Sequence, residues 1–172
     1  MKNTFIHFTE FNLDTIESIF KNGIMSSYNL QKNGIYKDAG IGNNGKYYIS
    51  LTKNTNYQNS AFNLFKHNPN NIGIEVISNY AIKTKKINCF LFTNTKLPIR
   101  YSIYDDEWQT KEIIHPDKFI SFYYPLEFIY DLYKKDTNYL NYISEEINKI
   151  KELMKTYNIN IPLNTNEKVY KL

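Results

Sequence analysis

The stretch Thr4-Phe5-Ile6-His7-Phe8-Thr9, which runs through Asn12-Leu13 to Asn22-Gly23, decides the fold of this chain. Its first six residues are β-branched or aromatic apart from His7, which predicts a β-strand. A helix is predicted directly after this strand, because apolar residues recur at helical spacing: Leu13, Ile16, Ile19 and Phe20. The chain therefore opens with a strand that feeds at once into an amphipathic helix.

The ends of this helix carry the expected signals. Asn12 or Asp14 can cap its start, and Asp14 with Glu17 fits a capping box. Gly23 suits the left-handed position after its last turn.

The rest of the chain predicts an α+β fold in one domain, residues 1–172. Residues 26–46 are rich in Gly and Asn and predict a loop with one short helical turn. We expect strands at 46–52, 72–77 and 119–123 and within 87–92, 99–104 and 108–114, and helices at 57–67, 125–134 and 137–157. The last helix has an apolar stripe: Leu140, Ile143, Ile147, Ile150 and Leu153. The tail from Asn158 is expected to be extended.

Composition limits the classes of function. The net charge of +4 permits a nucleic-acid partner but does not require one, and Arg100 is the only arginine. A single cysteine, Cys89, excludes an intrachain disulfide and argues against a cysteine zinc site. We expect a cytoplasmic protein with no membrane partner, because the sequence has no signal-peptide core and no long apolar run.

Two strands place polar side chains together. His7 and Thr9 share one face of the first strand, and Tyr48 and Ser50 share one face of a later one. Polar residues of this kind can line a cleft, and a tyrosine can stack on a planar heterocycle. The ordinary interpretations are a half-exposed strand end and core packing, and spacing alone favours them.

A third segment, which begins at Asp105, contains a candidate carboxylate. Glu107, Gln109 and Lys111 face one way, and Trp108 beside Glu107 is a possible desolvating neighbour. An acidic turn entering an edge strand is the alternative. The sequence has no G-x-G-x-x-G, P-loop or H-E-x-x-H motif, and its three histidines are dispersed, so no metal site is expected.

Together these segments resemble the DarT-like ADP-ribosyltransferases and related small phage and bacterial proteins. The opening Phe5-Ile6-His7-Phe8-Thr9 with Asn12-Leu13 and Asn22-Gly23-Ile24 is similar to their H-x-T strand and following helix. Tyr48–Lys53 is similar to their second-strand motif. Glu107–Ile114, with Pro116 and Phe119-Ile120, is similar to their last motif. The three motifs occur in the family's order over residues 4–123.

This resemblance implies an ADP-ribosyltransferase fold, in which a split β-sheet with flanking helices, residues 4–123, grips NAD. The helical segment predicted at about 125–157 follows this core. It implies that His7, Thr9 and Asn12 contact NAD, that Tyr48 and Ser50 line the nicotinamide pocket, and that Glu107 is catalytic. A carboxylate beside the ribose would stabilise the oxocarbenium-like charge that develops as nicotinamide leaves.

The implied function is NAD-dependent transfer of ADP-ribose to a macromolecular acceptor, a protein or a nucleic acid, by a bacterial toxin, effector or phage anti-defence protein. Two features depart from the family. Its arginine after the first helix is replaced by lysines, Lys32, Lys37 and Lys46, and a Glu-x-Glu pair is missing. The alternatives are a catalytically inactive binding module on the same fold, and a nucleic-acid-binding protein that uses Lys and Tyr.

Overall fold

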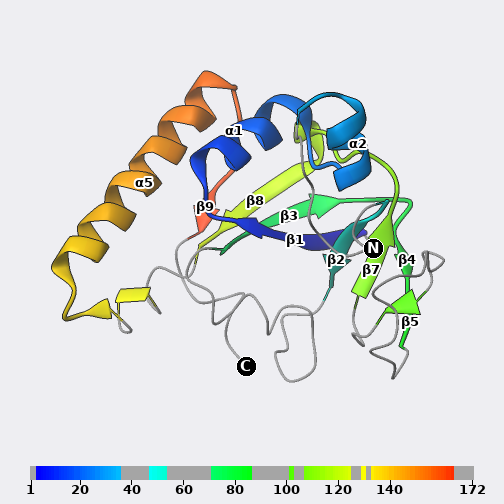
Figure 1. Cartoon of the computed structure of the whole chain (residues 1–172), viewed down its shortest axis with the longest axis horizontal. Coiled ribbons are helices and arrows are strands. Elements are labelled where there is room, and N and C mark those ends of the chain that lie inside the picture. The colour runs from blue at the N-terminus through cyan, green and yellow to red at the C-terminus, as the bar shows by residue number, and fades with distance from the viewer. Residues whose placement is uncertain are drawn as a thin grey trace.

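A seven-stranded sheet forms the centre of the protein (Figure 1). The computed structural model describes residues 3–35, 47–53, 71–86, 101–102, 107–124, 129–130 and 133–164. The strand order is β4-β7-β2-β1-β3-β8-β9, and every neighbouring pair is antiparallel except β8 and β9. The strands are β1 Thr4–Glu10, β2 Ile49–Thr52, β3 Asn71–Ile77, β4 Ile82–Lys83, β7 Glu107–Thr110, β8 Phe119–Tyr123 and β9 Leu163–Asn164. A separate parallel pair is formed by β5 Lys85–Lys86 and β6 Tyr101–Ser102.

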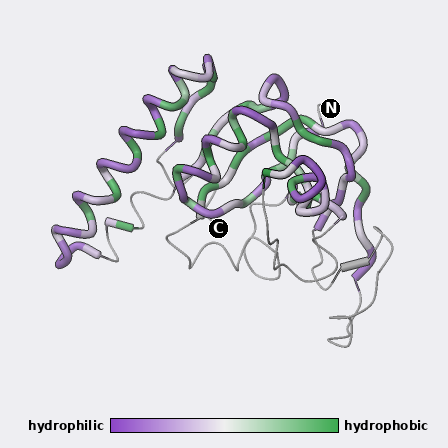
Figure 2. Tube along the Cα trace, turned by 45° about the horizontal axis from the view of Figure 1, so that its top comes forward, coloured by the Kyte–Doolittle hydropathy of each residue, from purple (hydrophilic) through white to green (hydrophobic). Residues whose placement is uncertain are grey.

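The described helices lie on one side of the sheet in Figure 1. They are α1 Leu13–Asn22, α2 Ser27–Lys32 and α5 Thr137–Thr156, with a short 3-10 helix η1 at Pro116–Lys118. Hydrophilic and hydrophobic residues alternate along α5 (Figure 2), as expected of a helix with one buried stripe. The Tyr157 hydroxyl at the end of α5 donates a hydrogen bond of 2.7 Å to Glu17 on α1.

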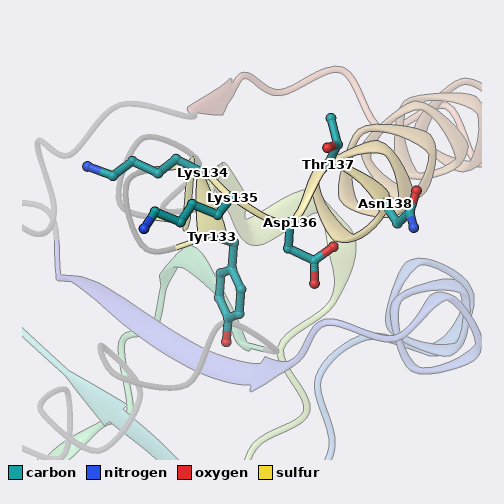
Figure 3. A pocket seen from close by; sticks show the side chains of 6 residues that line it. All are labelled: Tyr133, Lys134, Lys135, Asp136, Thr137 and Asn138. Carbon is teal, nitrogen blue, oxygen red and sulfur yellow. The ribbon is translucent and has the colours of Figure 1, made fainter.

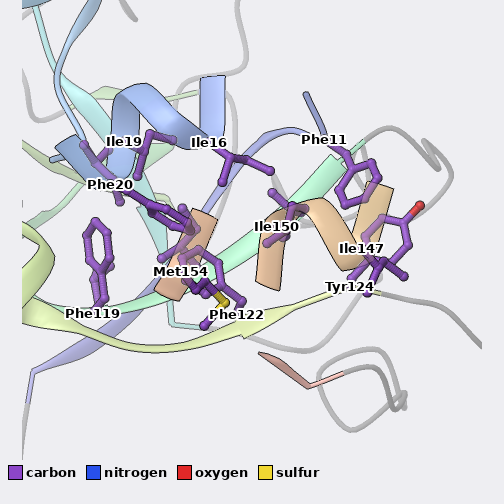
Figure 4. Close-up of a cluster of buried hydrophobic side chains, with 14 of the residues drawn as sticks. Phe11, Ile16, Ile19, Phe20, Phe119, Phe122, Tyr124, Ile147, Ile150 and Met154 are labelled. Carbon is purple, nitrogen blue, oxygen red and sulfur yellow. The ribbon is translucent and has the colours of Figure 1, made fainter. Parts of the chain in front are cut away.

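The core lies between this helical layer and the sheet (Figure 4). Phe20 of α1 packs edge-on against Phe122 of β8, with ring centroids 5.3 Å apart, and Phe11 stacks on Tyr124 at 4.2 Å. A register shift between Glu75 and Val76 lets both Phe119 and Phe122 of β8 reach the core. Burial of this apolar surface is the main force holding helices and sheet together.

The sheet changes direction between β1 and β2. β1 pairs with β3 along all seven of its residues, whereas β1 and β2 pair only at Ile6 and Thr52. In Figure 1, β1, β3 and β8 run across the view, and β2, β7 and β4 run down it. Pairing of β1 with β2 stops at this one residue pair. We call this break in the pairing, where His7 of β1 contacts the Ser50 carbonyl of β2, the opening between β1 and β2.

Most of the predicted elements are confirmed. The α+β class, the first strand, the first helix, the strand at 119–123 and the long C-terminal helix all occur, and α2 is the short helical turn expected in residues 26–46. Four of the five stripe residues on α5 are buried, and Met154 is buried in addition. The predicted helix at 57–67 and strand at 87–92 lie outside the described residues.

Other predictions were wrong in detail. Asn12 is the N-cap of α1, which confirms the first of the two predicted caps, whereas the box that starts at Asp14 does not form. Gly23 has a positive φ of 83°, but its ψ of 176° is extended, not left-handed helical. β7 begins at Glu107, one residue before the range 108–114 within which a strand was predicted, and Ile114 makes an isolated bridge to Ile24. The strands β4 and β9 were not predicted, because two residues are too few for a periodicity.

Candidate functional site

A fixed carboxylate stands at the start of β7. Glu107 is only 7% exposed, and its Oε1 atom accepts two hydrogen bonds. The Ser50 hydroxyl on β2 donates one at 2.6 Å, and the Gln109 amide donates the other at 2.9 Å. The antiparallel register explains this geometry, because it pairs Thr52 with Glu107 and Ser50 with Gln109 and so turns these side chains to one face.

The backbone of Glu107 is also held. Its carbonyl oxygen accepts hydrogen bonds from both the amide and the hydroxyl of Thr84, at 3.0 and 2.8 Å. Thr84 is buried just after β4. The position of Glu107 is therefore fixed through both its main chain and its side chain, and Thr84 is a supporting residue that sequence analysis missed because β4 is so short.

Trp108 does not desolvate Glu107, contrary to the sequence-based expectation. Its ring packs against Phe5, with centroids 5.2 Å apart, and under the Lys53 ammonium at 4.4 Å. Neighbouring residues of a strand point to opposite faces, so the Trp108 side chain cannot cover the Glu107 carboxylate.

His7 lies in the opening between β1 and β2. Its Nδ1 atom is 3.0 Å from the Ser50 carbonyl oxygen. A carbonyl can only accept, so Nδ1 carries the proton and Nε2 is left as an acceptor in the neutral ring. Burial lowers the pKa of His7 below its ordinary value of 6.5, and the bond to Ser50 opposes this only in part. The imidazole is consequently neutral at pH 7.

The predicted site residues occupy two faces of the sheet. His7 and Thr9 pair with Ile74 and Ile72 and lie on the helix-covered face, whereas Ser50 and Glu107 lie on the opposite face. Ser50 joins the two groups, because its carbonyl contacts His7 and its hydroxyl contacts Glu107. This connection passes through the opening between β1 and β2.

A cavity of about 250 Å³ adjoins the His7 side of the opening. It lies beside β1 and is bounded by α1, α2 and the residues after them. Its lining is mainly apolar with a few hydroxyl and charged groups: His7, Thr9, Asp14, Thr15, Ser18, Ile19, Gly23, Ile24, Met25, Leu30 and Ile35. An apolar lining with a few polar groups is typical of small-molecule sites, although this cavity is smaller than most of them.

Two further residues from the sequence analysis have defined positions. The Asn12 side-chain oxygen accepts hydrogen bonds from the amides of Asp14 and Thr15, so it acts here as a helix cap. Its contact with NAD stays a prediction. Tyr48 precedes β2, and the Lys111 ammonium lies 5.4 Å from its ring centroid. Of the lysines after the first helix, Lys32 ends α2 and is exposed. Lys37, Lys46 and Arg100 lie outside the described residues.

A second carboxylate, Glu75 on β3, was not singled out from the sequence. Its Oε2 atom accepts hydrogen bonds from Ser121 at 2.8 Å and Tyr123 at 3.0 Å. It shares a face with Glu107, but β1 and β2 lie between their strands, which places the two backbones roughly 14 Å apart. The two carboxylates therefore do not form a catalytic pair.

A shallow hollow of about 530 Å³ at the start of α5 is a weaker candidate. Its polar side chains do not converge, since Lys134 and Lys135 extend away from Asp136 (Figure 3). Among the described residues, no group of three His, Cys, Asp or Glu could hold a metal ion, and no helix has the length and apolar character to cross a membrane.

Comparison with known proteins supports the fold and leaves the activity open. No protein-family model and no curated protein matches the sequence. Among solved structures, the chain is similar to Thermosipho africanus DarTG in complex with ADP-ribose, with a TM-score of 0.56 and 11% identity. The match covers 99% of this chain and 51% of that one, so the chain spans about half of its length. DarT is an ADP-ribosyltransferase, and the likeness is one of fold.

Proposed function

We propose that this protein cleaves the nicotinamide–ribose bond of NAD and transfers ADP-ribose to a macromolecular acceptor, with Glu107 as the catalytic carboxylate. The observation that carries this proposal is the buried Glu107 side chain, held by Ser50 and Gln109 beside the opening between β1 and β2. A fold similar to DarTG, whose solved complex contains ADP-ribose, supports the same ligand class.

The arrangement suits the chemistry of this reaction. The bond between ribose C1′ and the nicotinamide nitrogen breaks, and its electron pair leaves with nicotinamide. A new bond then forms between C1′ and an acceptor heteroatom, which loses a proton. Positive charge develops on the ribose in between, and a carboxylate that is already oriented stabilises this charge without reorganising. Two hydrogen bonds to one oxygen provide that orientation for Glu107.

The residues on the other side of the opening fit a binding role. His7 presents a neutral ring whose Nε2 can accept a hydrogen bond, and Thr9 adds a hydroxyl to the same cavity. Ser50 links this cavity to the carboxylate, because its carbonyl contacts His7 and its hydroxyl donates to Glu107. In this proposal His7, Thr9 and Asn12 contact NAD, Tyr48 and Ser50 lie beside the nicotinamide end, and the protein acts as a toxin, effector or anti-defence protein.

Incubation with labelled NAD and a bacterial lysate tests the proposal. Wild-type protein should label a protein or nucleic acid, and the isosteric Glu107→Gln variant should label it at least about 100-fold more slowly. Glu112→Gln is the matched control, because Glu112 is exposed and follows β7 closely. Equal labelling by wild type and Glu107→Gln would remove Glu107 from the mechanism. An absence of both NAD binding and labelling would favour the inactive binding module.

A further inference from the structure

The face of β7 that carries Glu107 also carries further polar side chains. Glu107, Gln109 and Lys111 alternate along the strand and its end, opposite Thr52, Ser50 and Tyr48 of the β2 segment. The Lys111 ammonium lies over the Tyr48 ring, as expected if the pairing of β2 and β7 extends by one further residue pair. A carboxylate, an amide and an ammonium group therefore follow one another on a single face.

Gln109 has one unsatisfied group. It is only 2% exposed, and its Nε2 donates to Glu107, but its Oε1 has no hydrogen-bond partner among the described residues. The reverse orientation of the amide would set two acceptor oxygens against each other. A buried acceptor without a donor is unfavourable, and such groups in native structures call for a specific explanation. A hydroxyl of a bound molecule would supply the missing donor.

Lys111 differs from Lys53 and Lys83, two other lysines of this half of the sheet. Lys53 lies over the rings of Phe5 and Trp108 on the opposite face, and Lys83 is in register with Trp108. Lys111 thus shares a face with Glu107, whereas Lys53 and Lys83 lie on the Trp108 face. It is exposed, so its ammonium group can contact an anion from solvent.

We propose that Gln109 and Lys111 recognise a ribose phosphate held beside Glu107, which rests on the function proposed above and assigns two further binding residues to it. The Gln109 amide oxygen accepts a hydrogen bond from a ribose hydroxyl, and the Lys111 ammonium pairs with the phosphate. Alternate residues on a strand are roughly 6.6 Å apart, which is comparable to the span of a ribose and its 5′-phosphate. The ribose phosphate belongs either to NAD or to a nucleic-acid acceptor.

Ligand truncation tests the phosphate contact. Binding is measured in the Glu107→Gln background, to prevent turnover, with NAD, with nicotinamide riboside, which lacks phosphate, and with a single-stranded oligonucleotide. Lys111→Ala should weaken NAD binding roughly tenfold and leave nicotinamide riboside unchanged, because one charge-assisted contact is lost at an exposed site. Lys83→Ala, which removes an equal charge from the other face, should change neither. Weakening of the oligonucleotide alone would assign the phosphate to the acceptor.

The amide contact gives a different pattern. Gln109→Met should weaken NAD and nicotinamide riboside alike, because both ligands carry ribose hydroxyls. The inference would be overturned if Lys111→Ala weakened the binding of NAD and of the oligonucleotide no more than Lys83→Ala does. It would also be overturned if Gln109→Met bound nicotinamide riboside as tightly as its Glu107→Gln parent. If Glu107→Gln still abolishes labelling in that case, the proposed function survives. A wild-type chain that binds neither NAD nor the oligonucleotide would overturn both.

Discussion

The hydrogen bond from Ser50 to Glu107 gives a sharp test of how the site works. Ser50→Ala removes the hydroxyl that donates to Glu107 Oε1 at 2.6 Å, but keeps the backbone carbonyl that accepts from His7. The two contacts of Ser50 can therefore be separated with one substitution. Since Ser50 is exposed, the loss of its hydroxyl leaves no cavity in the core.

The magnitude follows from the type of bond. A hydroxyl that donates to a carboxylate at this distance makes a charge-assisted hydrogen bond, worth about 1.5–3 kcal/mol. The lower end applies here, because Ser50 is exposed to water and Gln109 keeps its own bond to the same oxygen. A loss of about 1.4 kcal/mol of transition-state stabilisation corresponds to roughly a tenfold fall in kcat.

The assay is the initial rate of transfer from labelled NAD, with the free energy of unfolding measured in parallel. We expect kcat to fall in Ser50→Ala, and a fall in NAD affinity in addition would report the proposed contact of Ser50 with the nicotinamide end. The double variant with Gln109→Leu should lose more than the sum of the single losses, because the carboxylate then loses both restraints. An unchanged kcat in Ser50→Ala, with wild-type stability, would refute the idea that hydrogen bonds orient Glu107 for catalysis.

Three further outcomes concern stability. Gly23→Ala should lower the free energy of unfolding, measured by chemical denaturation, by about 3 kcal/mol or more. Its Cβ would lie 2.6 Å from the Ile114 carbonyl oxygen, at a φ of 83° that side chains rarely adopt. A smaller loss would show that the backbone relaxes. Asn12→Ala should lower the free energy of unfolding by about 1 kcal/mol and Asn12→Ser by much less. A fall in NAD affinity in both variants would show that Asn12 contacts the cofactor in addition to capping the helix. For His7, burial lowers the pKa in the folded state, so the unfolded chain binds protons more readily. The free energy of unfolding should fall as pH drops below about 6.5, and a His7→Gln variant with the same pH dependence would contradict this.

The local pattern was sufficient to predict several elements and the faces of their side chains. The spacing of apolar residues after Asn12 is enough to place α1, and strand alternation is enough to set His7 with Thr9 and Glu107 with Gln109. The same rule also explains an error, since Trp108 is next to Glu107 in sequence and therefore on the other face. Two-residue strands such as β4 lie below what periodicity can detect, and Thr84 was missed with it.

By itself, then, the sequence determined the opening strand and helix, the amphipathic α5 and the alternation within each strand, because these depend on residues a few positions apart. Tertiary structure decided which strands are neighbours. The contact of Ser50 with His7 spans 43 positions and its contact with Glu107 spans 57. Such contacts depend on strand order and register, which are fixed by packing of the whole sheet against its helices. Only the folded chain brings the predicted residues together through Ser50, at the opening between β1 and β2.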